Sequence, residues 1–288
     1  MFHICILPGH FIRIWWGYVL DRCLSRWAAS ILTGLGLLLL VSGASSVAAA
    51  ELRLFTEEYR PLSYTEDGQL KGMAVEVVEL LLQRAGVAGK IELVPWTRGY
   101  HQVQSESDLA LFPVARTAKR EDQFTWVGPI AVSRTGVYTK RNSGLHLRNL
   151  QDLEDQGVTA VPKLWYTYEY LSDIGLKGLY AVPTPRHVAR MFKHGRIGVL
   201  VTTDMVLDDL LAEEGMSRDE VELQFHILDS YTYIAFSLDT SPALIQHLQK
   251  TMDQINRDGT LERIHRRWFT EPYLVPLAPP WSSMPRQS

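Results

Sequence analysis

The 288-residue chain contains only two cysteines, and both lie near its start, at Cys5 and Cys23. The absence of cysteine from all later positions excludes disulfides, thiol nucleophiles and cysteine-based zinc sites there. The sequence also has no P-loop, no GxGxxG segment after a predicted strand, and no HExxH motif. Nucleotide and zinc chemistry are therefore unsupported, and we expect neither a cofactor nor a metal site.

Blocks of basic residues are absent as well. The whole chain has a net charge of −3, and the first 50 residues carry three arginines and one aspartate. The remaining sequence therefore holds 26 basic and 31 acidic residues, with a net charge of about −5. A mildly acidic chain of this kind is not expected to bind nucleic acid or an anionic membrane.

An export signal is predicted for residues 1–50. Three arginines precede an apolar run over residues 28–41, and small residues follow up to Ala50. The apolar run is shorter than the ~20 residues that a membrane-spanning helix requires. A cleavable signal peptide is therefore favoured over a membrane anchor, and we expect an exported, periplasmic protein that begins near Glu51.

Strand and helix patterns alternate along the rest of the chain. Strands are predicted at residues 52–55, 90–96, 109–112, 136–139, 158–161, 198–202 and 233–236. Helices are predicted at residues 73–83, 150–153, 166–174, 189–194, 242–255 and 261–268, and a proline-rich tail at residues 271–288. Short strands that alternate with helices of about ten residues indicate an α/β fold with mixed, mainly parallel sheets.

These elements form two sets that are joined near residues 130–138 and again near residues 229–233. This pattern predicts two lobes with a hinge that the chain crosses twice. Lobe 1 is expected to be discontinuous and to comprise residues 51–134 and 231–270, with lobe 2 formed by residues 135–230. Because ligands of open α/β sheets bind beyond the carboxyl ends of strands, we expect the binding site in the cleft between the lobes.

Two arginines four residues apart, Arg116 and Arg120, follow a short apolar run over residues 109–114. Thr117 is predicted to cap the start of a helix, where free backbone N–H groups and the guanidinium groups would converge on one anion. A carboxylate suits such a site. A solvated charged turn is the alternative interpretation of this segment when it is taken alone.

Four stretches of the sequence together carry a resemblance to a known family. They are Glu58-Tyr59-Arg60-Pro61-Leu62-Ser63-Tyr64 with Gly68 and Gly72, Val94-Pro95-Trp96-Thr97-Arg98-Gly99-Tyr100, Arg116-Thr117-Ala118-Lys119-Arg120-Glu121 with Phe124, and Tyr233-Ile234-Ala235-Phe236-Ser237 with Asp258-Gly259 and Trp268-Phe269. In this order the chain resembles, over about residues 52–269, the family 3 solute-binding proteins, the polar amino-acid receptors of ABC importers. The resemblance implies a two-lobed periplasmic binding protein fold of type II.

The resemblance also implies roles for individual side chains. Tyr59 matches an aromatic residue that stacks on the ligand, Trp96 an aromatic residue in the wall of the first lobe, and Arg120 the arginine that clamps an α-carboxylate. A bidentate pair between arginine and carboxylate is chemically suited to this role. Packing of Tyr59 on Pro61 and an ordinary core position for Trp96 are the alternatives.

The sequence departs from the family pattern at three places. Ala115 stands where many members carry a serine or threonine, which removes one donor to the carboxylate. The acidic residue expected to hold an α-ammonium group falls on Thr203, or on Asp204 if the register shifts by one. The second-lobe loop at residues 161–165 replaces a small glycine-rich anion site.

These departures leave the ligand class open between an amino acid and another small polar metabolite. Lys163 and Trp165, which lie in the altered second-lobe loop, are candidate ligand contacts together with Arg116. These three side chains would suit a different anionic or aromatic ligand. The set of candidate binding residues is therefore Tyr59, Trp96, Arg116, Arg120, Lys163, Trp165, Thr203 and Asp204.

We expect a monomeric periplasmic receptor that captures an amino acid or related carboxylate and delivers it to an ABC permease in the inner membrane. One alternative is an accessory protein that presents its ligand to a sensor or chemoreceptor. Another is an enzyme similar to cyclohexadienyl dehydratases, for which Glu57, Glu58 and Asp204 would be the candidate carboxylates. No histidine of the chain has the spacing of a triad or metal site, so we expect no enzymatic activity.

Overall fold

The computed structural model describes residues 51–269, and the predicted leader and tail lie outside this range. We call the part built around the first strands the first half. Its elements are β1 (Leu52–Thr56), β2 (Tyr64–Glu66), β3 (Gln69–Lys71), α2 (Met73–Ala85), β4 (Gly89–Leu93), α3 (Trp96–Ser105), β5 (Leu109–Ala115), the short 3-10 helix η1 (Glu121–Gln123), α8 (Pro242–Arg257) and α9 (Thr260–Trp268).

The second half contains the elements between two long strands, β6 (Thr125–Lys140) and β10 (Val221–Phe236), that belong to both halves. Its own elements are α4 (Leu150–Glu154), β7 (Thr159–Pro162), α5 (Tyr166–Asp173), β8 (Leu179–Val182), α6 (Pro185–Lys193), β9 (Val199–Thr203), the 3-10 helices η2 (Asp204–Val206) and η3 (Arg218–Glu220), and α7 (Leu207–Glu213).

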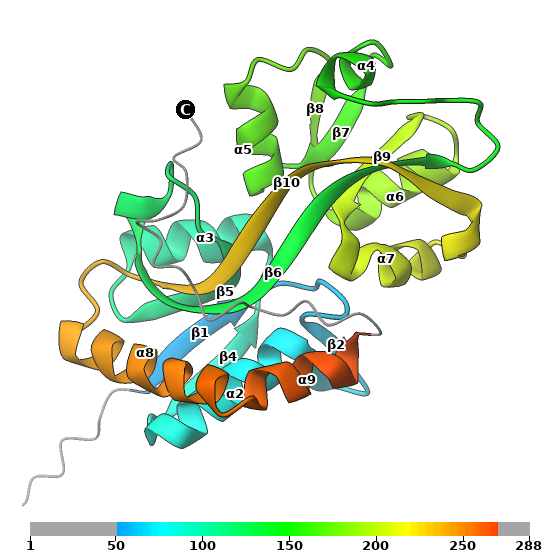
Figure 1. The fold of residues 1–288 in the computed structure, drawn as a ribbon. Coiled ribbons are helices and arrows are strands. Elements are labelled where there is room, and N and C mark those ends of the chain that lie inside the picture. Colours follow the sequence, from blue (N-terminus) through cyan, green and yellow to red (C-terminus); the bar gives the residue numbers. More distant parts are fainter. Residues whose placement is uncertain (1–50, 270–288) are drawn as a thin grey trace, which may run out of the picture. The chain divides into compact units, whose positions relative to one another are not determined.

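A six-stranded mixed sheet with the order β4-β1-β5-β10-β6-β9 connects the two halves. β1 pairs in parallel with β4 and β5, whereas β10 pairs antiparallel with β5 and β6, and β6 antiparallel with β9. β7 and β8 form a separate parallel pair. Figure 1 shows β6, in green, and β10, in yellow to orange, running side by side from one half to the other. The antiparallel part of the sheet thus comes from the strands that cross between the halves.

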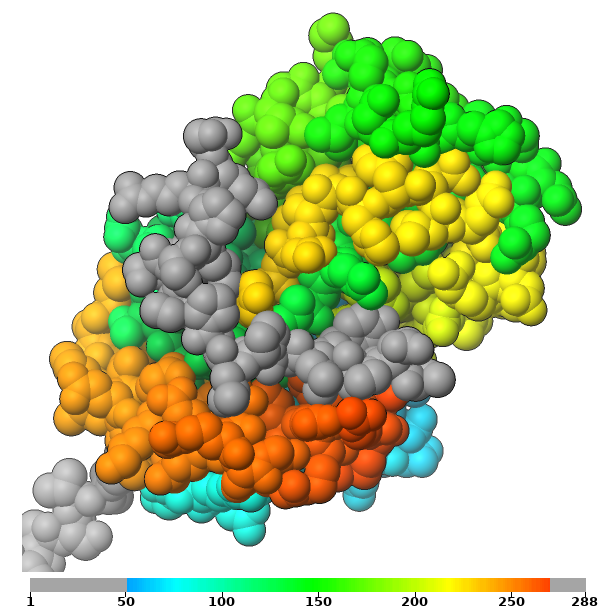
Figure 2. All heavy atoms as spheres, viewed as in Figure 1, coloured from blue at the N-terminus to red at the C-terminus, as the bar shows by residue number. Residues whose placement is uncertain are grey.

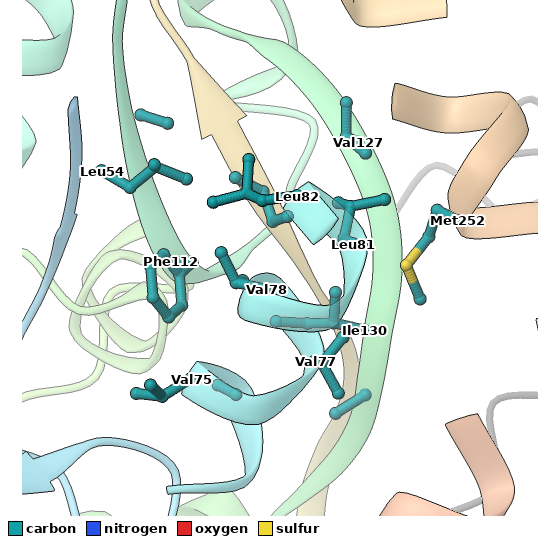
Figure 3. Packing of buried hydrophobic residues seen from close by; sticks show 14 of the residues in the cluster. Leu54, Val75, Val77, Val78, Leu81, Leu82, Phe112, Val127, Ile130 and Met252 are labelled. Atoms are coloured by element: carbon teal, nitrogen blue, oxygen red, sulfur yellow. The ribbon is translucent and has the colours of Figure 1, made fainter. Parts of the chain in front are cut away.

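The first half is built on two buried clusters, one on each face of the sheet. On one face α2 and α8 pack on the strands, and Figure 3 shows Leu81 of α2 and Met252 of α8 in a cluster with Val127 and Ile130 of β6. In Figure 2, α8 and α9, in orange to red, form the surface of this face. α3 covers the other face through Val103 and its neighbours. Burial on both faces explains the continuous apolar run of β5.

The second half has its own two clusters around β6 and β9. Alternate residues of β9 point to opposite faces, so Leu200 packs with α6 and α7, whereas Val199 and Val201 pack with β7 and α5. Tyr138 and Val137 of β6 are divided between the faces in the same way. This two-sided burial follows from the period of two along a strand. None of the helices within residues 51–269 is long and apolar enough to cross a membrane.

Several elements differ from their predicted bounds. The strand predicted at residues 90–96 ends at Leu93, and Trp96 begins α3, a helix that was not predicted. Helix α6 starts at Pro185 rather than Ala189, because Thr184 caps it by accepting a hydrogen bond from the His187 N–H. α7, β8 and the first twelve residues of β10 were also not predicted.

A tight backbone approach fixes the loop that follows β1. The backbone N–H groups of Met73 and Ala74, at the start of α2, donate to the carbonyls of Pro61 and Leu62 at 3.0 and 2.9 Å. Gly72 makes this approach possible with φ +134°, and a Cβ atom there would lie 2.3 Å from the Leu62 carbonyl oxygen. The loop that carries Tyr59 is thereby attached to the first half at a glycine that no other residue can replace.

We predict that Gly72→Ala lowers the free energy of unfolding by about 3 kcal/mol or more, because it combines strain at positive φ with overlap of backbone atoms. Gly68→Ala is the matched control, since Gly68 also has positive φ but a Cβ atom there meets no atom within 4 Å. The control should lose about 1 kcal/mol. Urea unfolding of both variants measures the difference, and equal losses would contradict the steric explanation.

Candidate ligand-binding site

An inner cavity lies where the carboxyl ends of strands from both halves converge, as expected for open α/β sheets. Glu57 follows β1, Ala115 ends β5, Trp165 follows β7, and Thr203 ends β9. The cavity contains about 470 Å³ of empty space, its mouth included. Its polar and aromatic lining includes Glu57, Tyr59, Trp96, Arg120, Trp165, Tyr166 and Thr203.

A larger outer cavity, with about 1170 Å³ of empty volume including open solvent, shares Glu57 and Trp96 with the inner cavity. Glu58 and Lys163 line the outer cavity alone. Glu57 and Trp96 therefore stand at the boundary between the two spaces.

Arg120 is only 1% exposed, and acceptor groups of the second half form hydrogen bonds with its guanidinium. Its Nε and Nη2 atoms donate to the two carboxylate oxygens of Glu169 at 3.0 and 2.9 Å. Nη2 also donates to the Leu164 carbonyl at 2.7 Å, and the guanidinium lies 5.2 Å from the ring centre of Tyr100. This bidentate geometry is the one in which arginine binds a carboxylate most strongly.

The loop between β7 and α5 contacts the first half through the Leu164 carbonyl. This oxygen accepts a hydrogen bond from Trp96 Nε1 at 3.3 Å in addition to the one from Arg120. Glu169 lies in the first turn of α5, where the helix dipole favours a negative charge. The second-half loop and the start of α5 therefore present two kinds of acceptor to Arg120.

Tyr59 also lines the inner cavity. Its hydroxyl lies 3.3 Å from Thr203 Oγ1, and its ring meets the Trp165 ring edge-on with 4.8 Å between centroids. Burial raises the pKa of the Tyr59 hydroxyl well above its ordinary value of 10.0, so the group stays neutral. Tyr166 is fixed nearby by a 2.6 Å hydrogen bond between its hydroxyl and Thr135 Oγ1.

Two of the predicted contacts do not line either cavity. Arg116 makes a bidentate ion pair with Glu121, at 2.8 and 2.6 Å, and lies over the rings of Trp126 and Tyr233. The Asp204 carboxylate accepts from both the backbone N–H and the side chain of Arg134 at 3.1 Å. Both charges are therefore held by neighbours outside the cavities.

The predicted helix start at Thr117 is also absent. Residues after β5 form a turn, and the short helix η1 begins only at Glu121. Thr117 Oγ1 is buried and has no hydrogen-bond partner within the residues that the structure describes. Arg120 directly precedes η1 as its N-cap residue, and its guanidinium donates to side-chain and carbonyl oxygens.

Most of the predicted site residues line one of the two cavities, together with residues that were not predicted. Tyr59, Trp96, Arg120, Trp165 and Thr203 line the inner cavity, and Lys163 lines the outer one. Glu169 and Tyr166 were not predicted as site residues. Their place in the first turn of a helix directly after the altered loop was the available signal, but sequence alone does not reveal which arginine they approach.

Glu57 lines both cavities, yet its carboxylate has no hydrogen-bond or ion-pair partner within residues 51–269. Burial raises the pKa of this carboxyl group from its ordinary 4.5 to about 8. Among the described residues no group of three or more histidine, cysteine, aspartate or glutamate side chains is placed to bind a metal ion. Glu57 is accordingly an isolated acidic group that faces a space with aromatic walls.

We predict that Glu57→Gln stabilises the protein at alkaline pH relative to the wild type. Because the folded-state pKa is raised, protonation favours folding, and the wild type loses this contribution as pH rises from about 4.5 to about 8. The uncharged variant lacks this loss. Melting temperatures of both proteins between pH 5 and pH 9 should therefore diverge with increasing pH, and a constant difference would show that Glu57 titrates normally.

Comparison with known proteins places this geometry in a family. Residues 52–271 match the family described as bacterial extracellular solute-binding proteins, family 3. The L-cystine-binding protein TcyA of Bacillus subtilis (strain 168) is 23% identical over 216 residues, which cover 74% of this chain and 78% of the relative. The arginine-binding extracellular protein ArtP of the same organism is 23% identical over 227 residues, 74% of this chain and 83% of the relative.

Solved structures show the same fold at lower identity. A histidine kinase sensor domain with similarity to periplasmic binding proteins aligns with a TM-score of 0.70 and 19% identity, over 76% of this chain and 96% of that one. An ancestral arginine-binding protein bound to arginine gives 0.66 and 18%, over 76% and 98%. The fold is thus the predicted two-lobed periplasmic binding protein fold. Since the family match covers most of its length, the chain belongs to the bacterial extracellular solute-binding proteins of family 3.

Proposed function

We propose that this solute-binding protein captures a small amino acid or related carboxylate in its inner cavity and delivers it to an ABC-type importer. In this proposal the protein acts in the periplasm, as a monomer that meets a permease of the inner membrane. Lobe 1 comprises residues 51–134 and 231–270, and lobe 2 residues 135–230. The ligand carboxylate binds Arg120, and Tyr59, Trp96, Trp165 and Thr203 surround the rest of the ligand.

The geometry of Arg120 carries this proposal. Its guanidinium already binds a carboxylate, that of Glu169, through two parallel hydrogen bonds at 3.0 and 2.9 Å. Glu169 therefore stands in for the carboxylate of a ligand and supports the assignment of this position as an anion site. A ligand that binds here must exchange with Glu169, which frees α5 from the arginine.

In this proposal the crossing strands supply the hinge for such an exchange. Ser133 of β6 and Ser230 of β10 face each other in the ladder, and their hydroxyl oxygens lie 3.1 Å apart. Small side chains at this point leave the two strands free of bulky cross-strand packing. Bending there would open the cavity, as in other two-lobed proteins that close around a ligand by a hinge motion.

The names of relatives favour the amino-acid class and the transport role. TcyA is named for L-cystine and ArtP for arginine, both of which are amino acids. A solved structure titled for glutathione import through GshT and the cystine ABC importer TcyBC of Streptococcus mutans aligns with a TM-score of 0.68 and 17% identity, over 79% of this chain and 98% of that one. These names bear on the class of ligand and not on its identity.

A sensory role is the second candidate. The alignment with a histidine kinase sensor domain supports it, because the same fold then serves to present a ligand to a signalling protein. Both roles use the same cavity and differ in the partner. The three curated relatives are named as binding proteins, which favours binding over the dehydratase-like alternative.

We predict that Arg120→Lys weakens binding of carboxylate ligands at least about tenfold, because lysine keeps the charge but loses the bidentate fork. Arg116→Lys is the matched control, since Arg116 also holds a glutamate by two hydrogen bonds but lies outside the cavity. A thermal-shift screen of free amino acids and small carboxylates identifies ligands, and isothermal titration then gives the dissociation constants. Equal effects of the two substitutions would contradict the clamp.

We predict further that Glu169→Gln strengthens carboxylate binding several-fold, because it removes the internal carboxylate that competes for Arg120. The same substitution should lower the free energy of unfolding of the ligand-free protein by about 3 kcal/mol or more, since a buried charge loses its partner. The ligand affinity of this variant should thus increase while its free energy of unfolding decreases. Weaker binding together with lower stability would show that Glu169 supports the site rather than competes for it.

A further inference from the structure

The backbone of Leu164, in the loop between β7 and α5, has a left-handed conformation with a φ angle of 61°. Within residues 51–269 the other non-glycine residues with positive φ are Asp67 and Asp108, and aspartate tolerates this region because its short side chain can form local hydrogen bonds. In leucine the Cβ atom lies too close to the backbone, which lowers the population of this conformation about five- to thirtyfold. Leu164 is therefore strained, and its surroundings must offset the strain.

The contacts that offset this strain come from the first half. The Leu164 carbonyl accepts hydrogen bonds from Arg120 Nη2 at 2.7 Å and from Trp96 Nε1 at 3.3 Å. The partly buried Leu164 side chain packs on the buried cluster that α3 covers, and the Trp165 ring belongs to the same cluster. Leu164 and Trp165 thus reach from the second half into the first.

The residues on either side of Leu164 are held by the second half itself. The Lys163 N–H donates to the Val182 carbonyl of β8 at 2.9 Å, and the Trp165 N–H donates to the Pro162 carbonyl at 3.4 Å. Because these hydrogen bonds do not involve the first half, they would persist if the halves separated. Leu164 would lose the contacts that offset its strain, and its backbone would return to an ordinary conformation with negative φ.

We infer that Leu164 is a positioning residue whose strained backbone directs its carbonyl to Arg120 and limits the stability of the ligand-free contact between the halves. The inference rests on the proposed function, because Arg120 Nη2 donates both to Leu164 and to Glu169, and a ligand carboxylate needs the same nitrogen. Release of the strain favours release of this nitrogen. A ligand then replaces a contact that is weaker than its hydrogen bonds alone would make it.

Glycine and alanine at position 164 separate the strain from side-chain packing. Leu164→Gly and Leu164→Ala both lose the leucine side chain, but only glycine adopts positive φ without a penalty. The ratio of closed to open molecules in the ligand-free protein should therefore be at least about fivefold higher for Leu164→Gly than for Leu164→Ala. Lys163 is the control position, because it is not one of the described residues with positive φ. Lys163→Gly should give a ratio no higher than that of Lys163→Ala.

Fluorescence energy transfer between dyes on the two halves measures this ratio. Cys5 and Cys23 are the only cysteines of the chain, so replacing both with serine allows specific labelling at two introduced cysteines. Lys90→Cys in β4 and Lys177→Cys between α5 and β8 provide these sites, since both lysine side chains are exposed, at 62% and 85%. Equal ratios for the glycine and alanine variants of Leu164, or the same difference at the control position, overturn the inference.

Binding of glutarate, measured by isothermal titration, tests the consequence for the ligand site. Leu164→Gly should bind glutarate at least about threefold more weakly than Leu164→Ala, because its Arg120 is released less readily. Equal affinities together with a higher closed ratio overturn the link between Leu164 and ligand binding. Failure of glutarate and of every screened carboxylate to bind the wild type overturns the proposed function. The fluorescence comparison uses no ligand, so it still decides whether strain in Leu164 opposes closure.

Discussion

A guanidinium group remains charged under all conditions in which a protein folds, and Arg120 holds one at 1% exposure. A buried charge without partners is destabilising by several kcal/mol, so the chain must supply acceptors around it. Those acceptors, the Glu169 carboxylate and the Leu164 carbonyl, both belong to the second half, whereas Arg120 follows a strand of the first. The placement of α5 and of the loop before it, and with them Trp165 and the inner cavity, therefore depends on this contact.

In the proposed function, the same contact would link ligand binding to the arrangement of the halves. A ligand carboxylate at Arg120 would require the donors that now bind the Glu169 carboxylate, so one would have to leave when the other binds. The free energy available for a conformational change would then be the difference between two interaction energies, that of Arg120 with the ligand carboxylate and that of Arg120 with Glu169. The full strength of either interaction would not be available. The remaining contacts across the cavity, such as Tyr59 with Thr203, involve neutral groups and are weaker individually. If the proposed ligand binds Arg120, exchange with Glu169 would accordingly be the step with the largest energetic consequence.

Sequence predicted those parts of the fold in which a local pattern decides the structure. The apolar run at residues 198–202 coincides with β9 to within one residue, because burial on both faces requires it. Helix α3 was missed because Val94-Pro95-Trp96 continues the alternation of the preceding strand, and Gly99 lies inside the helix, where Leu111 and Val94 pack closely against it. Most of β10 was missed because its outer part alternates irregularly and is stabilised by non-local pairing with β6.

The site shows the same division between local chemistry and non-local partners. The motif around Arg120 indicated a carboxylate, but its partner in the structure lies 49 residues away on another helix. The end of β9 shows how one position in the register decides which side chain lines the cavity: Thr203 lines it, whereas Asp204 pairs with Arg134. By resemblance to the family, an acidic residue is expected at this strand end to hold an ammonium group. The acid that lines the cavity is instead Glu57, which directly follows β1 in the first half.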